Sequence, residues 1–571
     1  MSILITWSRK WYALSGIVLA SLFTQPLIAQ TVNSKPYQAA IATVEGKLRA
    51  GQFPEALSLM DSITQEYPKA DDVFFMRALV LGELRNMDAA LGSVDQAIAI
   101  SPKPNYLSYA ITLTKNKGDF QKATNYIDLL IQQDPKNAAN YREKMILLQY
   151  NKQPEEAFKL YETVKAEFGA TDTLDLLYAD LLSANKRPQE AKGILKSWVD
   201  KKTSIRPIYA NLAQLYLDEG NKRGAMLLLE QAIPLVKDDY LYLDLADVYR
   251  ENKKDKLAFD NLKKAFESMD INFMDKNRII ASSFTNNGLS FAQLLELTTL
   301  LTVKYPRIAE AHLLKGQALW MNNQSADARA QLLVAVGINP QQIDAWRMLM
   351  NVDLSLNEPA EAIRHGQEAL SVNPNQPILL YFMGISHMVK EDLGNARSYL
   401  EAALNNAQRE NNFLQATIYS SLGDVYHQLK MEAASDVAYR EAINLDSTNV
   451  SALNNLSYYL SLRKKDLEFA AKSALAANEL RPNDPTFQDT YAWVLFQQEN
   501  YQEALVWIQK AVKGSKVPSA VLYEHYGDIL VKNGRKTEAV KYWNLALTDA
   551  QKEGVDLERL KKKISTKSYV E

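Results

Sequence analysis

An alanine that recurs about every 34 residues is the feature that most limits how this chain can fold. Most steps between successive members of the series are 33 to 35 residues long. The members are Ala56, Ala90, Ala123, Ala157, Ala191, Ala225, Ala258, Ala328, Ala362, Ala396, Ala470, Ala504 and Ala539. Self-similarity at a period of this length indicates a stacked array of helical hairpins, each of which buries its apolar face only against its neighbours.

Two further small residues keep step with this alanine. One lies seven residues after it, at Ala97, Ala232, Ala265, Ala335, Ala369, Ala403, Ala477, Ala511 and Ala546. The other lies twelve residues before it, at Ala78, Ala179, Ala213, Ala246, Gly316, Gly384, Ala492 and Gly527. These positions predict close crossings between helices, where a leucine would overpack by roughly 1–3 kcal/mol.

A proline often closes the unit, twelve residues after the alanine. It stands at Pro68, Pro102, Pro135, Pro340, Pro374 and Pro482, whereas the fourth unit has Gly169 there. Proline lacks an N–H and restricts the residue before it, so we expect it to end the second helix of each unit.

This pattern of small residues, apolar residues and a closing proline resembles the tetratricopeptide repeat family. The agreement is good in YANLAQLYLDEGNKRGAMLLLEQAI, residues 209–233, and in EHYGDILVKNGRKTEAVKYWNLAL, residues 524–547. The resemblance covers about residues 37–550. It implies an all-α, right-handed superhelical solenoid of about fifteen hairpins, arranged in one or two subarrays.

Departures from the pattern suggest how the chain is divided. Leu294 replaces the alanine in a degenerate unit, and Ser435 replaces it after a connection lengthened by NNAQRENN. We therefore expect six segments: a signal peptide at 1–29, an N-terminal array at 37–270, a degenerate repeat at 271–306, an array at 307–406, a C-terminal array at 407–550, and a capping helix with a tail at 551–571.

Two other repetitive architectures fit the sequence less well. Pentatricopeptide repeats have a similar period but bind RNA, and a net charge of −2 with a pI near 6.3 does not favour that ligand. A coiled coil needs an unbroken seven-residue seam, whereas here the pattern restarts in each unit.

The N-terminus indicates export. Arg9 and Lys10 precede a short apolar run at 11–23, and Ala29 offers a small residue at the cleavage point. The larger Leu27 leaves an uncleaved membrane anchor as the alternative. From the signal segment we expect an exported protein in the periplasm or on the periplasmic face of the bacterial envelope. Because the chain has no cysteine, we expect that it is not a lipoprotein.

No motif in the sequence points to catalysis, a metal or a cofactor. The five histidines form no metal-ligand spacing, no glycine-rich loop matches a phosphate site, and cysteine chemistry is excluded. We expect no catalytic residue, cofactor or metal, and no nucleic-acid or small-molecule ligand. The run Lys561–Lys563 is expected to be a solvated helix face.

The family resemblance implies a concave groove lined by the first helix of each unit. The expected groove residues are Trp320, Met321, Arg347, Asn351, Tyr381, Met388, Asp424, His427, Asn454, Tyr458, Trp493, Phe496 and Asp528. Aromatic and methionine side chains there would anchor a peptide or helix of a partner protein, although the same residues also suit packing between helices.

These observations support three hypotheses of function. The preferred one is a non-catalytic scaffold of the bacterial envelope that binds partner proteins, in outer-membrane, secretion or cell-wall assembly by family analogy. The second is a membrane-anchored co-factor of another complex. An enzyme with its site on the concave face is the third, and it would need convergent polar groups such as His427 and Asp424.

Overall fold

The computed structural model describes residues 35–286, 288–408, 410–551 and 555–571, and the predicted signal peptide at 1–29 lies outside them. The described residues form thirty-one α-helices and no β-strand. The first thirty helices pair into fifteen consecutive hairpins, and α33 follows the last one. The predicted all-α repeat fold, with about fifteen hairpins, is confirmed.

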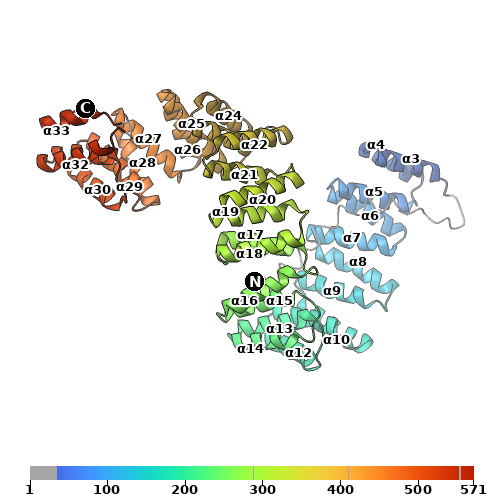
Figure 1. Cartoon of the computed structure of the whole chain (residues 1–571). Coiled ribbons are helices and arrows are strands. Elements are labelled where there is room, and N and C mark those ends of the chain that lie inside the picture. The colour runs from blue at the N-terminus through green and yellow to red at the C-terminus, as the bar shows by residue number, and fades with distance from the viewer. Residues whose placement is uncertain (1–34, 287, 409, 552–554) are drawn as a thin grey trace. The chain divides into compact units, whose positions relative to one another are not determined.

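The chain divides into two compact units between Ala265 and Phe266, within helix α16. Each unit is a row of stacked hairpins (Figure 1). The first unit contains α3 (Gln38–Arg49), α4 (Phe53–Glu66), α5 (Asp71–Glu83), α6 (Met87–Ile100), α7 (Pro104–Lys117), α8 (Phe120–Gln133), α9 (Ala138–Tyr150), α10 (Pro154–Phe168), α11 (Asp172–Ala184), α12 (Pro188–Asp200), α13 (Arg206–Asp218), α14 (Lys222–Ala232), α15 (Leu241–Glu251) and most of α16 (Asp255–Glu267).

The second unit begins with the degenerate hairpin of α17 and α18. Its helices are α17 (Phe273–Asn286), α18 (Phe291–Lys304), α19 (Ala309–Met321), α20 (Ser325–Ile338), α21 (Ile343–Ser355), α22 (Pro359–Val372), α23 (Pro377–Val389), α24 (Leu393–Asn406), α25 (Asn412–Gln428), α26 (Glu432–Leu445), α27 (Val450–Leu462), α28 (Leu467–Leu480), α29 (Pro485–Gln497), α30 (Tyr501–Gly514), α31 (Ala520–Lys532), α32 (Lys536–Asp549) and α33 (Leu557–Thr566). The finer segment boundaries expected from the sequence remain predictions.

The recurring small residues lie where helices cross. Ala504 and Ala511, on α30, are both fully buried, as is nearly every other alanine of the two series. A Cβ added to Gly316 would lie 2.8 Å from Leu332, and one added to Gly384 would lie 2.6 Å from Leu400. Each glycine is on a first helix and each leucine is on the following second helix. The hairpins therefore leave no room for a larger side chain at these crossings.

The turns inside the hairpins share one backbone conformation. A residue with positive φ stands between the two helices of nearly every hairpin, for example Gly118, Lys186, Asn357 and Lys430. Glycine takes this conformation without steric cost, whereas lysine does so against its preference. The turns between hairpins have a different sequence, in which a closing proline often follows the second helix. Pro68, for instance, lies two residues beyond the end of α4.

Within each unit, the stack of hairpins curves toward its first helices. Within the units, first helices of successive hairpins contact one another, as α21 does with α23 and α27 does with α29. Successive second helices make no comparable contact anywhere in the described ranges. Because the first helices are the more closely spaced layer, they form the inner, concave side of the stack, and we call them the inner layer.

Candidate interaction surface

All thirteen groove residues predicted from the sequence lie on first helices of the second unit. They are carried by seven consecutive first helices, α19, α21, α23, α25, α27, α29 and α31. The structure thus brings them together on one inner layer. That they contact a partner remains a prediction.

These residues differ in how much surface they leave for a partner. Most are half-buried: Trp320, Met321, Arg347, Asn351, Tyr381, Met388, Asp424, His427 and Tyr458. The other four are buried: Asn454 at 6% exposure, Trp493 at 6%, Phe496 at 4% and Asp528 at 1%. The half-buried side chains are held by packing on one side and leave the other side free to contact a partner. The buried side chains mainly support the half-buried ones.

A polar cluster lies where α25, α26 and α27 meet. The hydroxyl of Tyr439 donates to Asp424 Oδ1 at 2.5 Å, and Asn455 Nδ2 donates to the same oxygen at 3.0 Å. Burial raises the pKa of the Asp424 carboxyl, while these two hydrogen bonds act in the opposite direction. Burial also raises the pKa of Tyr439. Two donors therefore hold this carboxyl in place on the inner layer.

His427 lies beside this cluster but bonds elsewhere. Its ring stacks on Tyr459 with centroids 3.6 Å apart, and its Nδ1 lies 3.4 Å from Glu432 Oε2. Arg463 bridges to the same Glu432 oxygen at 2.7 Å. The histidine is thus fixed between a tyrosine and an acid that already has a cationic partner.

A run of stacked rings crosses α29 and α31. Trp493 lies parallel to Phe496, with centroids 4.7 Å apart, and to His525, with centroids 4.0 Å apart. His525 Nδ1 is 2.9 Å from Asp489 Oδ1, which orients the imidazole. Burial raises the pKa of the neighbouring Tyr458 to about 12, so this phenol stays protonated at neutral pH.

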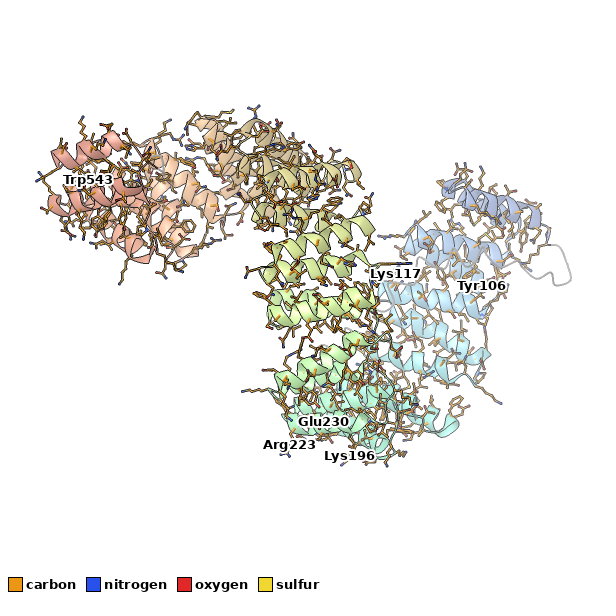
Figure 2. All side chains as sticks on the ribbon, viewed as in Figure 1. Tyr106, Lys117, Lys196, Arg223, Glu230 and Trp543 are labelled. Carbon is orange, nitrogen blue, oxygen red and sulfur yellow. The ribbon has the colours of Figure 1, made fainter. Side chains whose placement is uncertain are left out.

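An ion cluster joins α31 to α33 at the end of the array. Lys563 Nζ lies 2.6 Å from both Glu524 Oε1 and Asp528 Oδ2, and Arg559 donates two hydrogen bonds of 3.0 Å to Glu524. Trp543, on α32 in the last hairpin (Figure 2), donates its indole N–H to Asp528 at 2.9 Å. This cluster pins α33 onto the last hairpin.

The expectation of a solvated lysine face is wrong for Lys563, which is only 2% exposed. The cluster was not predicted, although the sequence carries a signal for it. Glu524 and Asp528 are four residues apart on one helix, and Arg559 and Lys563 are four apart on another. Matching i, i+4 pairs of opposite charge suit two helices that pack side by side.

The inner layer of the first unit also carries charged side chains that are held by ion pairs and hydrogen bonds. Arg206 lies 2.7 Å from Asp244 and 3.0 Å from Asp238. Asn211 donates to Asp180 at 2.5 Å, and burial raises the pKa of Asp180 to about 6. Aromatic side chains are present as well, such as Tyr106 on α7 (Figure 2), but Tyr106 is buried.

The described residues contain no group of three or more histidine or acidic side chains arranged to hold a metal ion. Two shallow, open hollows lie in the described ranges, one beside Arg206 and Asp238 and one beside Arg559 and Val570, and neither is lined by His427 or Asp424. In the same residues, no helix is both long enough and apolar enough to cross a membrane.

Comparisons with known proteins agree with this architecture. Three family models, each described as tetratricopeptide repeat, match residues 317–552, residues 42–103 with 290–343, and residues 207–235, and together they cover more than half of the chain. The human protein O-mannosyl-transferase TMTC3 is 27% identical over 165 residues. That match spans 28% of this chain and only 18% of TMTC3.

Two solved structures are similar to the chain at low scores. The Cut9 and Hcn1 hetero-tetramer of APC/C includes a chain with a TM-score of 0.39 and 15% identity, over 81% of this chain and 96% of that one. YrrB, a TPR protein with an unusual peptide-binding site, has a TM-score of 0.27 and 21% identity, over 32% and 92%. On its repeat period, its fifteen hairpins and the matching family models, the chain belongs to the tetratricopeptide repeat family.

Proposed function

We propose that this protein is a non-catalytic scaffold that binds segments of partner proteins on the inner layer of its second unit. The observation that carries the proposal is the continuity of that layer. Five consecutive first helices, from α19 to α27 in alternate order, present half-buried aromatic, methionine and polar side chains on one side of the stack, and the buried groove residues of α29 and α31 continue the same layer.

The chemistry of this surface suits a protein ligand. Tyr381 and Tyr458 offer large apolar surfaces with few rotatable bonds, and Met388 offers a flexible side chain that adapts its shape. Both properties favour the anchoring of a partner side chain. Asp424 and Asn351 supply polar groups that orient a bound backbone. A helix or an extended segment laid across several hairpins would meet these groups in turn.

The absence of catalysis is part of the proposal. Asp424 is engaged by Tyr439 and Asn455, and His427 by Tyr459 and Glu432, so neither is directed at a common reacting atom. The similarity to a mannosyl-transferase spans only a small part of that enzyme, so it does not assign a transferase activity to this chain.

We also propose that the protein acts in the bacterial envelope, after export through the N-terminal segment. Basic residues followed by a short apolar run support this location. The alternative is a co-factor of another complex that keeps the segment as an anchor. N-terminal sequencing of the protein recovered from cells separates the two: a start near residue 30 supports export, and an intact residue 1 or 2 supports the anchor.

Site-specific photo-crosslinking in intact cells tests the scaffold function. A photoreactive amino acid replaces Tyr381 or Tyr458 on the inner layer, and matched controls replace Val437 on α26 or Val506 on α30. The two valines are 61% and 52% exposed and lie on second helices. We expect adducts with partner proteins from the inner positions alone. Equal adducts from both sides, or none from the inner positions, would overturn the proposal.

A further inference from the structure

The segment after α33 folds back across the second unit. Lys567 has φ of +52° and turns the chain out of the helix. Residues 568–571, which we call the tail, then reach the ends of earlier hairpins. Tyr569 meets Lys532 at the end of α31 and Phe496 at the end of α29, and Glu571 meets Lys464 just after α27.

An aromatic contact holds the middle of the tail. The rings of Tyr569 and Phe496 meet edge to face, with centroids 5.3 Å apart. The ammonium groups of Lys532 and Lys563 each lie 5.4 Å from the centroid of Tyr569. Tyr569 therefore extends the line of rings formed by His525, Trp493 and Phe496, with two cations close to its ring.

A charged contact holds the end of the tail. Lys464 Nζ lies 2.6 Å from the side-chain oxygen Oε1 of Glu571. Both side chains are at least half exposed, so this contact is open to solvent and to competition. The tail thus uses one aromatic group and one carboxylate, separated by Val570, to span the ends of three hairpins.

The tail differs from α33, which closes the array. Leu560 of α33 is fully buried in the core of the last hairpins, whereas Ser568 and Glu571 are exposed and Val570 is half-buried. Tyr569 is half-buried and packs against that core, so departure of the tail uncovers part of the core surface but removes no fully buried side chain. The tail is attached as a bound peptide is, through two side chains on a surface that the rest of the chain forms.

We infer that the tail is an intramolecular ligand, and that the surface beneath it is a subsite for protein segments in which an aromatic residue is followed two positions later by a carboxylate. Phe496 and Lys532 receive the ring, and Lys464 receives the acid. This inference deepens the proposed function, because Phe496 belongs to the inner-layer set. A partner with that pattern replaces the tail and continues onto the groove.

Competition by the tail sets the expected size of the effect. A ligand tethered by a few residues acts at an effective concentration on the order of mM. A free peptide of weak affinity cannot compete with it at micromolar concentration. Removal of the tail should therefore strengthen the binding of a free copy by about tenfold or more.

The experiment compares the full chain with a chain that ends at Lys567. The probe is a fluorescein-labelled peptide of sequence TKSYVE, the sequence of residues 566–571, and its binding is followed by fluorescence anisotropy. We expect the shortened chain to bind at least tenfold more tightly than the full chain. A peptide with alanine in place of the tyrosine should bind at least tenfold more weakly.

Substitutions in the shortened chain locate the subsite. Lys464→Glu should weaken binding at least fivefold, and the neighbouring exposed Lys465→Glu serves as the matched control that leaves it unchanged. Equal binding by the full and shortened chains, or equal effects of the two lysine variants, would overturn the inference. If the peptide fails to bind but Tyr381 and Tyr458 still crosslink partners, the subsite alone is wrong and the scaffold function stands.

Discussion

Gly527 and Trp543 face each other at the crossing of α31 and α32, so closely that a Cβ on the glycine would lie 2.4 Å from the indole ring. Trp543 is fully buried and its N–H is bound to Asp528, so the ring cannot move aside without loss of that bond. The same relationship joins Gly423 to Tyr439, with 2.6 Å between the added Cβ and the ring. Large rings on second helices thus depend on glycine opposite them.

Gly527→Ala should destabilise the second unit by about 1–3 kcal/mol through overpacking against Trp543. The matched control is Gly92→Ala in α6, where an added Cβ meets nothing within 4 Å. That change should be neutral or stabilise by up to about 1 kcal/mol, because alanine is the better helix former. Urea unfolding followed by circular dichroism measures both, and a stable Gly527→Ala variant would contradict the crossing argument.

Lys563→Met should loosen α33 from the last hairpin. Removal of one partner from a buried ion pair costs about 3–5 kcal/mol, because the remaining charge is left without compensation. Limited proteolysis should then cut the region of α33 at least several times faster than in the unchanged chain. Lys562→Met is the control, since Lys562 is exposed and its substitution should change stability by less than about 0.5 kcal/mol.

Asp528→Asn should change how stability depends on pH. Burial raises the pKa of Asp528 from 3.8 to about 6 in the folded protein, so its contribution to stability is complete below pH 3.8 and is lost as the pH rises through 6. Asparagine does not titrate, so the variant loses no stability in this way. The urea midpoint of the Asp528→Asn variant, relative to that of the unchanged chain, should therefore rise between pH 4 and pH 7, by an amount equivalent to about 2–3 kcal/mol.

The neighbouring Glu524 has the opposite dependence on pH, but it does not affect this comparison. Its folded-state pKa is lowered, with Lys563 and Arg559 outweighing its burial, so its stabilisation is present above its unfolded value and is lost as the pH falls. Glu524 is unchanged in the Asp528→Asn variant, so to first order its contribution cancels in the comparison. A constant difference between the two chains, or one that falls with rising pH, would contradict the assignment to Asp528.

Lys276→Met should destabilise the start of the second unit. Lys276 is fully buried, and its ammonium donates to the carbonyl oxygens of Phe266, at 3.1 Å, and Ser268. Methionine has a similar volume but leaves these carbonyls without this donor, at a cost of about 1–3 kcal/mol. Hydrogen exchange should become faster around residues 266–276.

The exposed Lys256→Met on α16 is the control for this change. It should leave the exchange rates of residues 266–276 as they are in the unchanged chain. Equal protection of that segment in the Lys276→Met variant would show that the buried ammonium is not what orders it.

The parts of the fold that follow from helix spacing could be predicted from the sequence. The alanine series locates the second helices because each member, such as Ala504, must be small at a crossing that repeats. The turns could not be predicted in the same way. Lys186 and Lys430 adopt positive φ, and a lysine carries no local signal for that conformation.

The predicted site was placed on the correct layer, yet its exposure could not be predicted. Counting positions along the repeat predicts the same exposure for Trp493 and for Tyr458. The structure distinguishes them because His525, from the next hairpin, stacks on Trp493. The pairing of Lys563 with Glu524 also joins residues from separate helices, so it depends on how α33 docks rather than on the repeat.

Among the described helices, extensive contacts within each unit join only neighbouring hairpins and successive first helices, so the chain can lengthen or shorten in whole steps. Duplication or loss of one 34-residue stretch would recreate the same junction at the seam, since similar crossings recur on both sides. Recombination between the repeats of such a gene can therefore change the length of the encoded array without requiring new contacts between helices.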